Sequence, residues 1–211
     1  MAKAEIGPGE FFPVVGVGPH EKPWPTGEEF DPELLENGDR RNVLDKYRYW
    51  KLEAIVADLS TKRHSLEIAI ENWQHDLNIG SIVRTANAFN VNAVHIVGKR
   101  DWNKRGAMVT DRYLTVKHHA SIAEFSTACF AEKLPIIGID NVPGSKKLES
   151  ADLPQRCVLL FGQEGAGMSD EAIAACEVIY AIEQYGSTRS MNASAAGAIA
   201  MYHWALQHLP R

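Results

Sequence analysis

The chain has 211 residues, of which 45% are hydrophobic and 23% charged, and its formal net charge is −5 at pH 7. This length fits one compact domain with an extension, and the apolar content is enough for a sizeable core. The mildly acidic balance argues against bulk electrostatic binding to nucleic acid, although a local basic surface is compatible with it.

Several features of the sequence point to the cytoplasm. No apolar stretch is long enough to span a bilayer, and the first residues lack the apolar segment of a secretion signal, so we expect no membrane partner. Three cysteines, Cys129, Cys157 and Cys176, are far apart and form no CxxC pair. They are typical of buried thiols in a reducing compartment rather than of disulfides, and we expect no bound metal.

Residues 1–38 are an N-terminal arm rich in proline and glycine. They hold six of the ten prolines together with six glycines, a density that argues against regular helix and central strand. One interpretation is an extended arm that aromatic side chains pin to the rest of the chain or to a second subunit. The other is a loosely ordered leader.

Residues 39–64 predict an N-terminal helix. Apolar residues recur on one helical face at Leu52, Ile55, Val56 and Leu59. Upstream of them, Arg41 and Arg48 stand among tyrosines and a tryptophan, a combination that suits phosphate contact and base stacking. The same pattern also fits a solvated face whose aromatics pack on a core. We treat the two arginines as candidate RNA-binding residues.

Strands and helices alternate over residues 65–211. Strands are expected over 66–70, 93–97, 135–139, 158–161 and 178–182, and helices over 79–89, 122–132, 170–175 and 192–209. This βαβ rhythm predicts an α/β domain with a parallel sheet and helices on both of its faces. Such sheets bind ligands at the carboxyl ends of their strands, which directs attention to the segments that follow the strands.

The first such segment, NIGSIVRTANAF from Asn78, leads into the helix expected at 79–89. Asn78 can cap this helix, and Gly80 permits another backbone to come close to its first turn. Arg84 follows one turn later among apolar neighbours, so its guanidinium must reach an edge or a partner. It is either a clamp for phosphate or carboxylate or a surface arginine in a helical ion pair.

A basic segment follows the strand expected at 93–97. It places four cationic side chains around a tryptophan, which suits contact with an RNA backbone and a stacking platform for a base. A solvated loop is the alternative. The residues concerned are Lys99, Arg100, Trp102, Lys104 and Arg105.

A glycine-rich loop, LFGQEGAGMSD from Leu160, leaves the strand expected at 158–161. Its spacing matches neither the dinucleotide fingerprint nor the P-loop, and Glu164 would repel a phosphate held by backbone N–H groups. Bare backbone beside one carboxylate suits a cationic or hydroxyl-bearing ligand. Glu164 could equally cap a tight turn or pair with Arg84.

A third segment, IEQYGSTRSMNASAAG from Ile182, runs from the last expected strand into the last expected helix. Its alanines and glycine leave little side chain at helical spacing, which suits close approach of another part of the chain. Its polar residues, Ser190 and Asn192 among them, stand where strand gives way to helix, at the ligand edge of the sheet.

Together, the three segments resemble the SpoU/TrmH branch of the SPOUT RNA methyltransferases. That family carries an N…NxGxxxRxAxxFG block, an LxxGxExxG block and an IPMxGxxxSLNxSxA block. The chain matches them in order, with Asn72 followed by NIGSIVRTANAF, then LFGQEG and IEQYGSTRSMNASA, over roughly residues 65–208. The resemblance implies a C-terminal trefoil knot, transfer of a methyl group from S-adenosylmethionine (AdoMet) to a ribose 2′-hydroxyl of tRNA or rRNA, and a homodimer.

The resemblance also implies roles for individual positions. Backbone groups at Gly162, Ile182 and Met191 would hold the adenosine of AdoMet. The positions for catalysis and substrate handling are Asn78, Arg84, Glu164, Ser190 and Asn192. Because a guanidinium stays protonated, we expect Arg84 to bind the phosphate beside the target ribose and to stabilise the developing oxyanion, with Glu164 orienting it.

The chain departs from the family pattern before Gly186, where Glu183, Gln184 and Tyr185 replace the usual proline and methionine. Arg189 adds a charge directly before Ser190, the serine of the third block. These departures bear on the shape of the cofactor pocket. Two alternatives to ribose methylation also stay open. One is a catalytically weak RNA-binding homologue that keeps the fold, and the other is a methyltransferase that acts on an RNA base.

Overall fold

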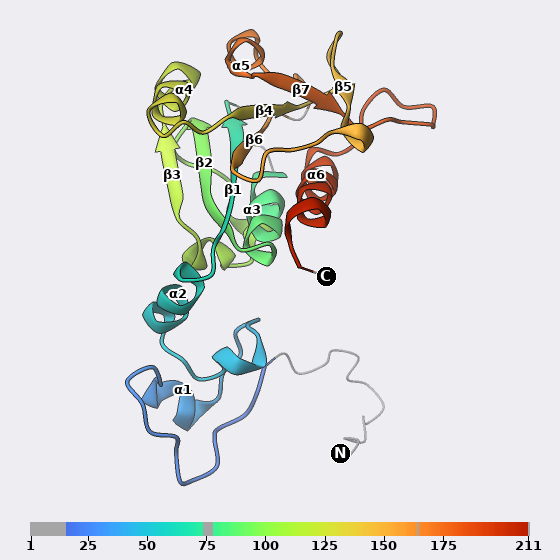
Figure 1. The fold of residues 1–211 in the computed structure, drawn as a ribbon. Helices are drawn as coiled ribbons and strands as arrows, with labels where there is room; N and C mark the ends of the chain where they lie inside the picture. Colours follow the sequence, from blue (N-terminus) through green and yellow to red (C-terminus); the bar gives the residue numbers. More distant parts are fainter. Residues whose placement is uncertain (1–15, 74–77, 164, 211) are drawn as a thin grey trace. The chain divides into compact units, whose positions relative to one another are not determined.

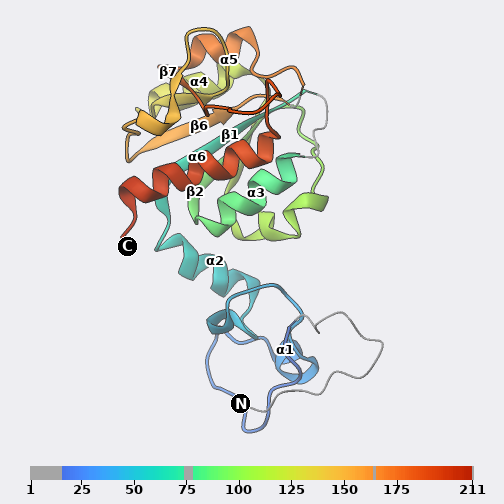
Figure 2. The same cartoon turned by 90° about the vertical axis from the view of Figure 1, so that its right-hand side faces the viewer.

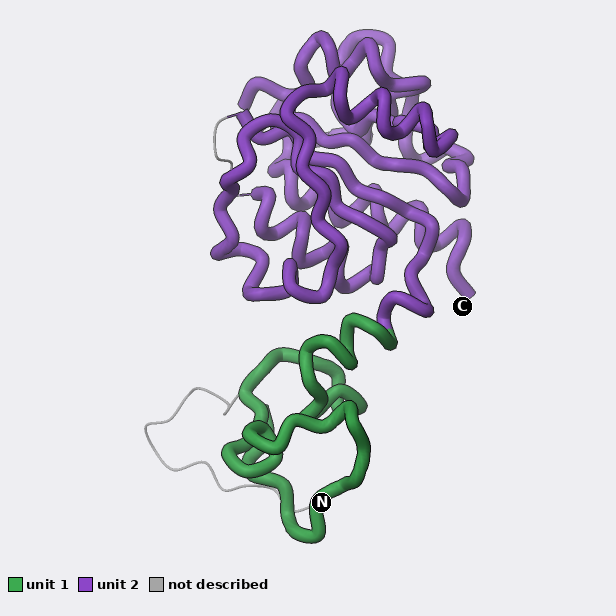
Figure 3. Tube along the Cα trace, turned by 90° about the vertical axis from the view of Figure 1, so that its left-hand side faces the viewer, with its two compact units in different colours: residues 1–58 green, residues 59–211 purple. Residues whose placement is uncertain are grey.

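The computed structural model describes residues 16–73, 78–163 and 165–210 (Figures 1 and 2). The chain divides into two compact units, residues 1–58 and residues 59–211 (Figure 3).

The larger unit is built on a sheet in which each pair of neighbouring strands is parallel. Over the described residues the sheet has seven strands in the order β3-β2-β1-β6-β4-β7-β5. The strands are β1 (His64–Asn72), β2 (Val91–Gly98), β3 (Val116–His119), β4 (Ile136–Ile139), β5 (Lys146–Lys147), β6 (Cys157–Phe161) and β7 (Val178–Ala181).

The central strand β1 shows why both faces of the sheet must be covered. Its side chains alternate between two cores: Leu66, Ile68 and Ile70 belong to one, and Ala69 belongs to the other. This follows from the two-residue period of a strand. A strand buried on both faces needs a nearly continuous apolar run, which residues 157–161 supply in the neighbouring strand β6.

Helices pack on both faces of the sheet. α3 (Asn78–Ala88) and α6 (Ala193–His208) lie side by side on the first core, and α4 (Ile122–Ala131) and α5 (Asp170–Ala175) pack on the second (Figure 2). A Cβ atom on Gly197 would lie 3.4 Å from the Cγ1 atom of Ile82, so this glycine lets α6 approach α3 closely. The predicted α/β fold with a doubly covered parallel sheet is confirmed. In the described part of the chain, no helix is long and apolar enough to cross a membrane.

The strands and helices predicted between residues 66 and 209 all exist, and their bounds differ from the expected ones by at most two residues. The pattern misses β3 and β5. Both are edge strands of this sheet, and both are rich in polar residues, with sequences VKHH and KK. An edge strand needs a main-chain partner but little burial, so apolar periodicity does not reveal it.

The smaller unit corrects two predictions. The proline-rich arm contains α1 (Pro32–Asn37), which begins because proline suits the first helical position and Asp31 caps the N–H groups of Glu33 and Leu34. The helix expected from residue 39 is present only as the short turn η1 (Asp45–Tyr47) and as α2 (Leu52–Ser60).

A buried carboxylate explains why residues 39–51 are not one helix. Asp39 is fully buried and accepts hydrogen bonds from the main-chain N–H groups of Arg41, at 3.0 Å, and of Tyr49, also at 3.0 Å. These bonds hold the segment as a loop, and Tyr49 has a left-handed φ of 64° that interrupts any helix. Such side-chain to backbone bonds compete directly with helix formation.

Candidate active site

The sheet order brings three loops together at one edge of the sheet. β4 lies between β6 and β7, and the loops after these strands surround a cleft of about 510 Å³. Parallel strands end at the same edge, so this is where an α/β sheet binds its ligand. The cleft is lined by residues 139–142, 161–163, 165–168, 182, 184, 190–193 and 196.

The first wall of the cleft is the glycine-rich turn after β6. Gln163 and Gly167 close this turn with two main-chain hydrogen bonds of 3.0 Å. A Cβ atom on Gly162 would lie 2.2 Å from the main-chain carbon of Gly167, so only glycine fits there. Gly167 itself has a φ of +71°. The turn therefore presents main-chain groups to the cleft. Glu164, the carboxylate of this motif, lies outside the described residues.

The second wall is the segment that enters α6. Asn192 is the N-cap of this helix, and its Oδ1 atom accepts from the N–H groups of Ser194, at 3.0 Å, and Ala195, at 3.3 Å. Its Nδ2 atom donates to the Oδ1 atom of Asn78 at 2.8 Å. Asn78 begins α3 and is only 7% exposed. One asparagine thus fixes the start of α6 and joins it to the start of α3.

The structure gathers most of the predicted catalytic and cofactor-binding residues at this cleft. Its lining includes Gly162, Ile182, Ser190, Met191 and Asn192. Asn78 adjoins the cleft through Asn192. Arg84 is exposed on α3 and is absent from the described residues that line the cleft. The roles of these residues stay predictions.

Sequence reasoning missed two polar residues of the cleft, Asp140 and Asn141. They directly follow β4 and line the cleft. The Oδ2 atom of Asp140 accepts from the N–H group of Met168 at 2.8 Å, and the Nδ2 atom of Asn141 donates to the carbonyl of Arg189. Their position could have identified them as site residues, because they follow the strand expected at 135–139 and so lie at the ligand-binding edge of the sheet.

The residues that depart from the family pattern form a surface cluster beside the cleft. Glu183 pairs with Lys147 at 2.7 Å and accepts a hydrogen bond from the hydroxyl of Tyr185 at 3.3 Å. The hydrogen bond from Lys147 lowers the pKa of the Glu183 carboxyl. Of the three replaced residues, Gln184 is the one that lines the cleft, and Tyr185 is 88% exposed.

The basic segment is docked on the first turn of α3. A Cβ atom on Gly80 would lie 2.8 Å from the main-chain nitrogen of Ala107, which confirms the close approach predicted at this glycine. The buried side chain of Asn72 also holds this segment, because its Nδ2 atom donates to the carbonyls of Lys99, at 2.7 Å, and Asp101, at 2.9 Å. The loop therefore lies beside Asn78 at the start of the same helix.

Within this loop, Lys99, Arg100 and Arg105 are exposed. Trp102 is half-buried and packs against the core, and the Nζ atom of Lys104 lies 5.5 Å from the centre of its ring. Lys104 also pairs with Asp111 at 3.2 Å. Lys99, Arg100 and Arg105 are therefore accessible to a phosphate backbone, whereas Trp102 exposes only part of its ring.

In the smaller unit, the two candidate arginines take part in a network around Asp39. Arg41 makes a bidentate contact with Asp39, at 2.9 and 2.7 Å, and donates to the carbonyl of Trp50 at 2.7 Å. Arg48 donates to the carbonyl of Arg41 at 2.5 Å. Burial would raise the pKa of Asp39, but the hydrogen bonds from Arg41 and Tyr49 lower it. An RNA phosphate would compete with these bonds for either guanidinium.

A chain of buried titratable side chains lies on the other face of the sheet. The Nε2 atom of His95 is 2.6 Å from Glu67, and its Nδ1 atom is 2.8 Å from the Nε2 atom of His119. Burial would raise the pKa of Glu67, but hydrogen bonds from His95 and Asn92 and the charges of His95 and Lys117 lower it to about 2. Burial lowers the pKa of His119, as does the charge of His95. Over the described residues, no group of three or more His, Cys, Asp or Glu is arranged to hold a metal ion.

The parallel sheet, the glycine turn and the capped start of α6 define the class of this protein. It is an α/β protein with a cleft between the loops at the carboxyl ends of adjacent strands, where such sheets bind ligands. Residues 65–202 match the model of the SpoU rRNA Methylase family, and the chain belongs to that family.

Individual relatives agree with this membership. The chain is similar to the tRNA (guanosine(18)-2'-O)-methyltransferase of Escherichia coli K12, with 26% identity over 147 residues that cover 68% of the chain. It spans 64% of the length of that curated relative. Among solved structures, it is similar to the SpoU methyltransferase AviRb from Streptomyces viridochromogenes, with 25% identity and a TM-score of 0.63 over 70% of the chain and 61% of AviRb. A complex of AviRb with the cofactor AdoMet matches with 24% identity and a TM-score of 0.63 over 71% of the chain and 63% of AviRb.

Proposed function

We propose that this protein transfers a methyl group from AdoMet to a ribose 2′-hydroxyl of tRNA or rRNA. Membership of the SpoU family supports the reaction class. The observation that carries the proposal is the cleft, where Gly162, Ile182 and Met191 lie together with Ser190 and Asn192 in one lining. Together with residues 139–142, these two stretches make three parts of the chain that meet around a single ligand-sized space.

The residues of the cleft fit AdoMet. Its volume of about 510 Å³ lies within the range of roughly 300–1,000 Å³ that is usual for small-molecule sites. Ile139, Phe161 and Ile182 provide apolar surface for an adenine ring. The Oε1 atom of Gln163 is buried and has no hydrogen-bond partner among the described residues, so it is ready to accept from an amino group of a ligand. AdoMet supplies an electrophilic methyl group on a sulfonium centre.

The polar residues of the site bind the substrates and stabilise the transition state. Ser190 and Asn192 hold the ribose and methionine ends of the two substrates, and Asn78 keeps the Asn192 amide in place. Arg84 binds the phosphate next to the target ribose and stabilises the oxyanion that forms as the hydroxyl loses its proton. Glu164 orients Arg84. The exposure of Arg84 supports this role, since RNA approaches from outside the domain.

RNA also contacts the basic segment beside α3, through Lys99, Arg100 and Arg105 together with Lys104 and the accessible part of Trp102. The segment adjoins Asn78 at the start of α3, which supports a path for the substrate strand toward the cleft. Arg41 and Arg48, in residues 39–64, are further candidate RNA contacts, and residues 1–38 act as an arm that contacts RNA or a second subunit.

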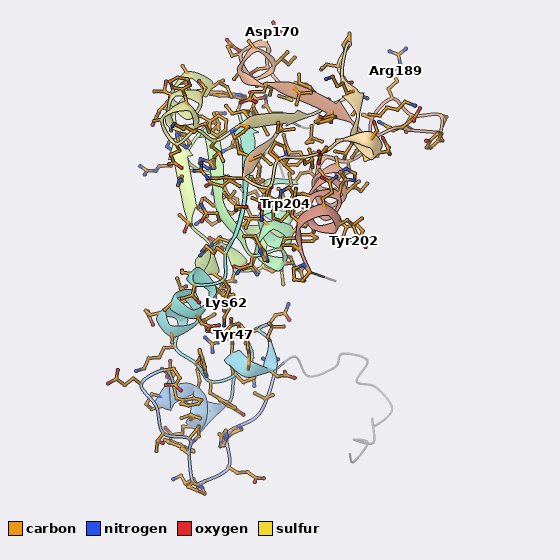
Figure 4. The ribbon with its side chains drawn as sticks, in the orientation of Figure 1. Tyr47, Lys62, Asp170, Arg189, Tyr202 and Trp204 are labelled. Atoms are coloured by element: carbon orange, nitrogen blue, oxygen red, sulfur yellow. The ribbon has the colours of Figure 1, made fainter. Side chains whose placement is uncertain are left out.

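A second copy of the chain covers the outer face of α6. The inner face of this helix buries Ala200, Met201 and Trp204, whereas Ile199, Tyr202 and Leu206 are 43%, 57% and 43% exposed. Trp204 and Tyr202 point to opposite sides of the helix (Figure 4). A helix that is apolar on all sides normally has no solvent-facing side. A symmetric homodimer through this stripe buries it. Membership of the SpoU family supports the proposal of a C-terminal trefoil knot.

The three cysteines support a reducing, cytoplasmic location. Cys129, Cys157 and Cys176 are free thiols, and burial raises the pKa of each to about 12, which makes them inert.

The decisive experiment is methyl transfer from tritiated AdoMet to RNA from cells that lack the gene. We expect label in alkali-resistant dinucleotides, because a 2′-O-methyl group blocks alkaline cleavage of the adjoining phosphodiester. Label in alkali-released mononucleotides would establish a base methyltransferase instead. RNA binding without any AdoMet binding by calorimetry would favour the catalytically weak homologue.

A further inference from the structure

The pair that follows β4, Asp140 and Asn141, takes no part in the chemistry above, yet it touches both walls of the cleft. Its backbone is firmly held. The N–H group of Asp140 donates to the carbonyl of Tyr180 at 3.0 Å, next to the pairing of Ile139 with Tyr180 in the β4–β7 ladder. Since β4 stands between β6 and β7, its end lies between the loops that follow those two strands.

Asp140 reaches the glycine turn on one side. Its Oδ2 atom accepts from the N–H group of Met168 at 2.8 Å, and its Oδ1 atom accepts from the N–H group of Asn141 at 2.7 Å. A Cβ atom on Gly167 would lie 2.8 Å from the same Oδ2 atom. The carboxylate is therefore packed directly against the backbone of the turn.

Asn141 reaches the loop between β7 and α6 on the other side. Its Nδ2 atom donates to the carbonyl of Arg189, and the Nε2 atom of Gln184 donates to the same carbonyl at 3.3 Å. The next two residues of this loop, Ser190 and Met191, line the cleft. The side chain of Arg189 points away from the domain, so the loop is held through its backbone (Figure 4).

We propose that Asp140 and Asn141 are positioning residues that brace the two walls of the cleft at the separation AdoMet requires. This proposal rests on the function proposed above. Asp140 holds the turn that carries Gly162, and Asn141 holds the loop that carries Ser190 and Met191. A braced cleft loses less conformational freedom when a ligand binds, so the brace contributes to affinity for AdoMet rather than to the chemical step.

The test uses Asn141→Asp, which keeps the size of the side chain but replaces the amide donor with an oxygen that repels the Arg189 carbonyl. The matched control is Asn90→Asp, directly before β2, where the amide donates to the carbonyls of Leu59, at 3.3 Å, and Lys62, at 3.0 Å. Both substitutions replace a side-chain amide that donates to main-chain carbonyls and add one negative charge. Only the first one acts at the cleft.

The first measurement needs no ligand. Trypsin cuts the peptide bond whose carbonyl belongs to Arg189, and it must take that carbonyl away from Asn141 to do so. We expect cleavage at Arg189 to become about three- to tenfold faster in Asn141→Asp, which is the effect of losing one hydrogen bond. Cleavage at Arg100 in the same digest serves as the internal reference and should not change. An unchanged rate at Arg189 would overturn the brace.

The second measurement is the kinetics of methyl transfer with varied AdoMet. We expect Asn141→Asp to raise KM for AdoMet about three- to tenfold while kcat stays within about twofold, and Asn90→Asp to change neither. A fall in kcat at constant KM would overturn a positioning role. If the wild-type protein binds no AdoMet, the proposed function fails, and the trypsin measurement still decides the brace.

Discussion

Asn192 performs two tasks that one substitution can separate. Its Oδ1 atom caps α6 through the N–H groups of Ser194 and Ala195, and its Nδ2 atom donates to Asn78 at 2.8 Å. Aspartate is as good an N-cap as asparagine, but it has no N–H group to donate. Asn192→Asp should therefore keep the cap of α6 and break the contact with Asn78, whereas Asn192→Ala should lose both.

The magnitudes follow from these contacts. Loss of a cap costs about 1 kcal/mol, and a negative charge at a helix N-terminus contributes about 0.3–1 kcal/mol. Asn192→Asp should therefore be more stable than Asn192→Ala by about 1–2 kcal/mol. Asn78 is 7% exposed, and removing the donor of a hydrogen bond to so buried an acceptor costs about 1–3 kcal/mol. If that loss falls on the transition state, methyl transfer drops by about tenfold or more in both variants.

Urea unfolding followed by circular dichroism measures the stability of the two variants, and tritium transfer to RNA measures their activity. The expected pattern is a clear difference in stability with a similar loss of activity. Methyl transfer by Asn192→Asp within twofold of the wild type would refute the role of the Asn192 amide. Equal stability of the two variants would refute the capping argument.

Four further substitutions test other parts of the molecule. Arg84→Ala should lower methyl transfer by about 100-fold or more without changing the affinity for AdoMet in calorimetry, and a near wild-type rate would contradict its role. Gly162→Ala should weaken AdoMet binding by more than about tenfold, since the new Cβ atom would lie 2.2 Å from the main-chain carbon of Gly167, and wild-type affinity would argue against the tight turn. Tyr202→Glu should convert a dimer into a monomer in light scattering, and a persistent dimer would move the interface away from α6. Glu67→Gln should lower the free energy of unfolding at pH 7 by about 3 kcal/mol, because a pKa lowered from 4.5 to about 2 stabilises the fold above pH 4.5 and loses that effect as the pH falls toward 2. Unfolding curves of wild type and variant that run parallel from pH 5 to pH 2 would contradict this reasoning.

An element of the fold could be predicted from the sequence when the residues that stabilise it lie within the element itself. The buried run at 157–161 and the apolar face of α3 carry their own period, so β6 and α3 were predicted from sequence. β5, a pair of exposed lysines, exists only because the end of β7 offers it main-chain partners. The loop at residues 39–51 depends on the buried carboxylate of Asp39, whose partners lie up to ten residues away. A local sequence pattern does not predict such a contact.

The sequence by itself determined which helices and which strands other than β3 and β5 follow one another between residues 66 and 209, and it contained the three motif blocks that carry the candidate site. Only the tertiary structure decided which residues meet. Asn78 and Asn192, 114 residues apart, share a hydrogen bond because α6 returns to pack on α3. Asp140 and Asn141 enter the cleft because β4 pairs between β6 and β7. Strand order results from pairing between distant segments, and a local apolar pattern shows that a strand exists without showing its neighbours.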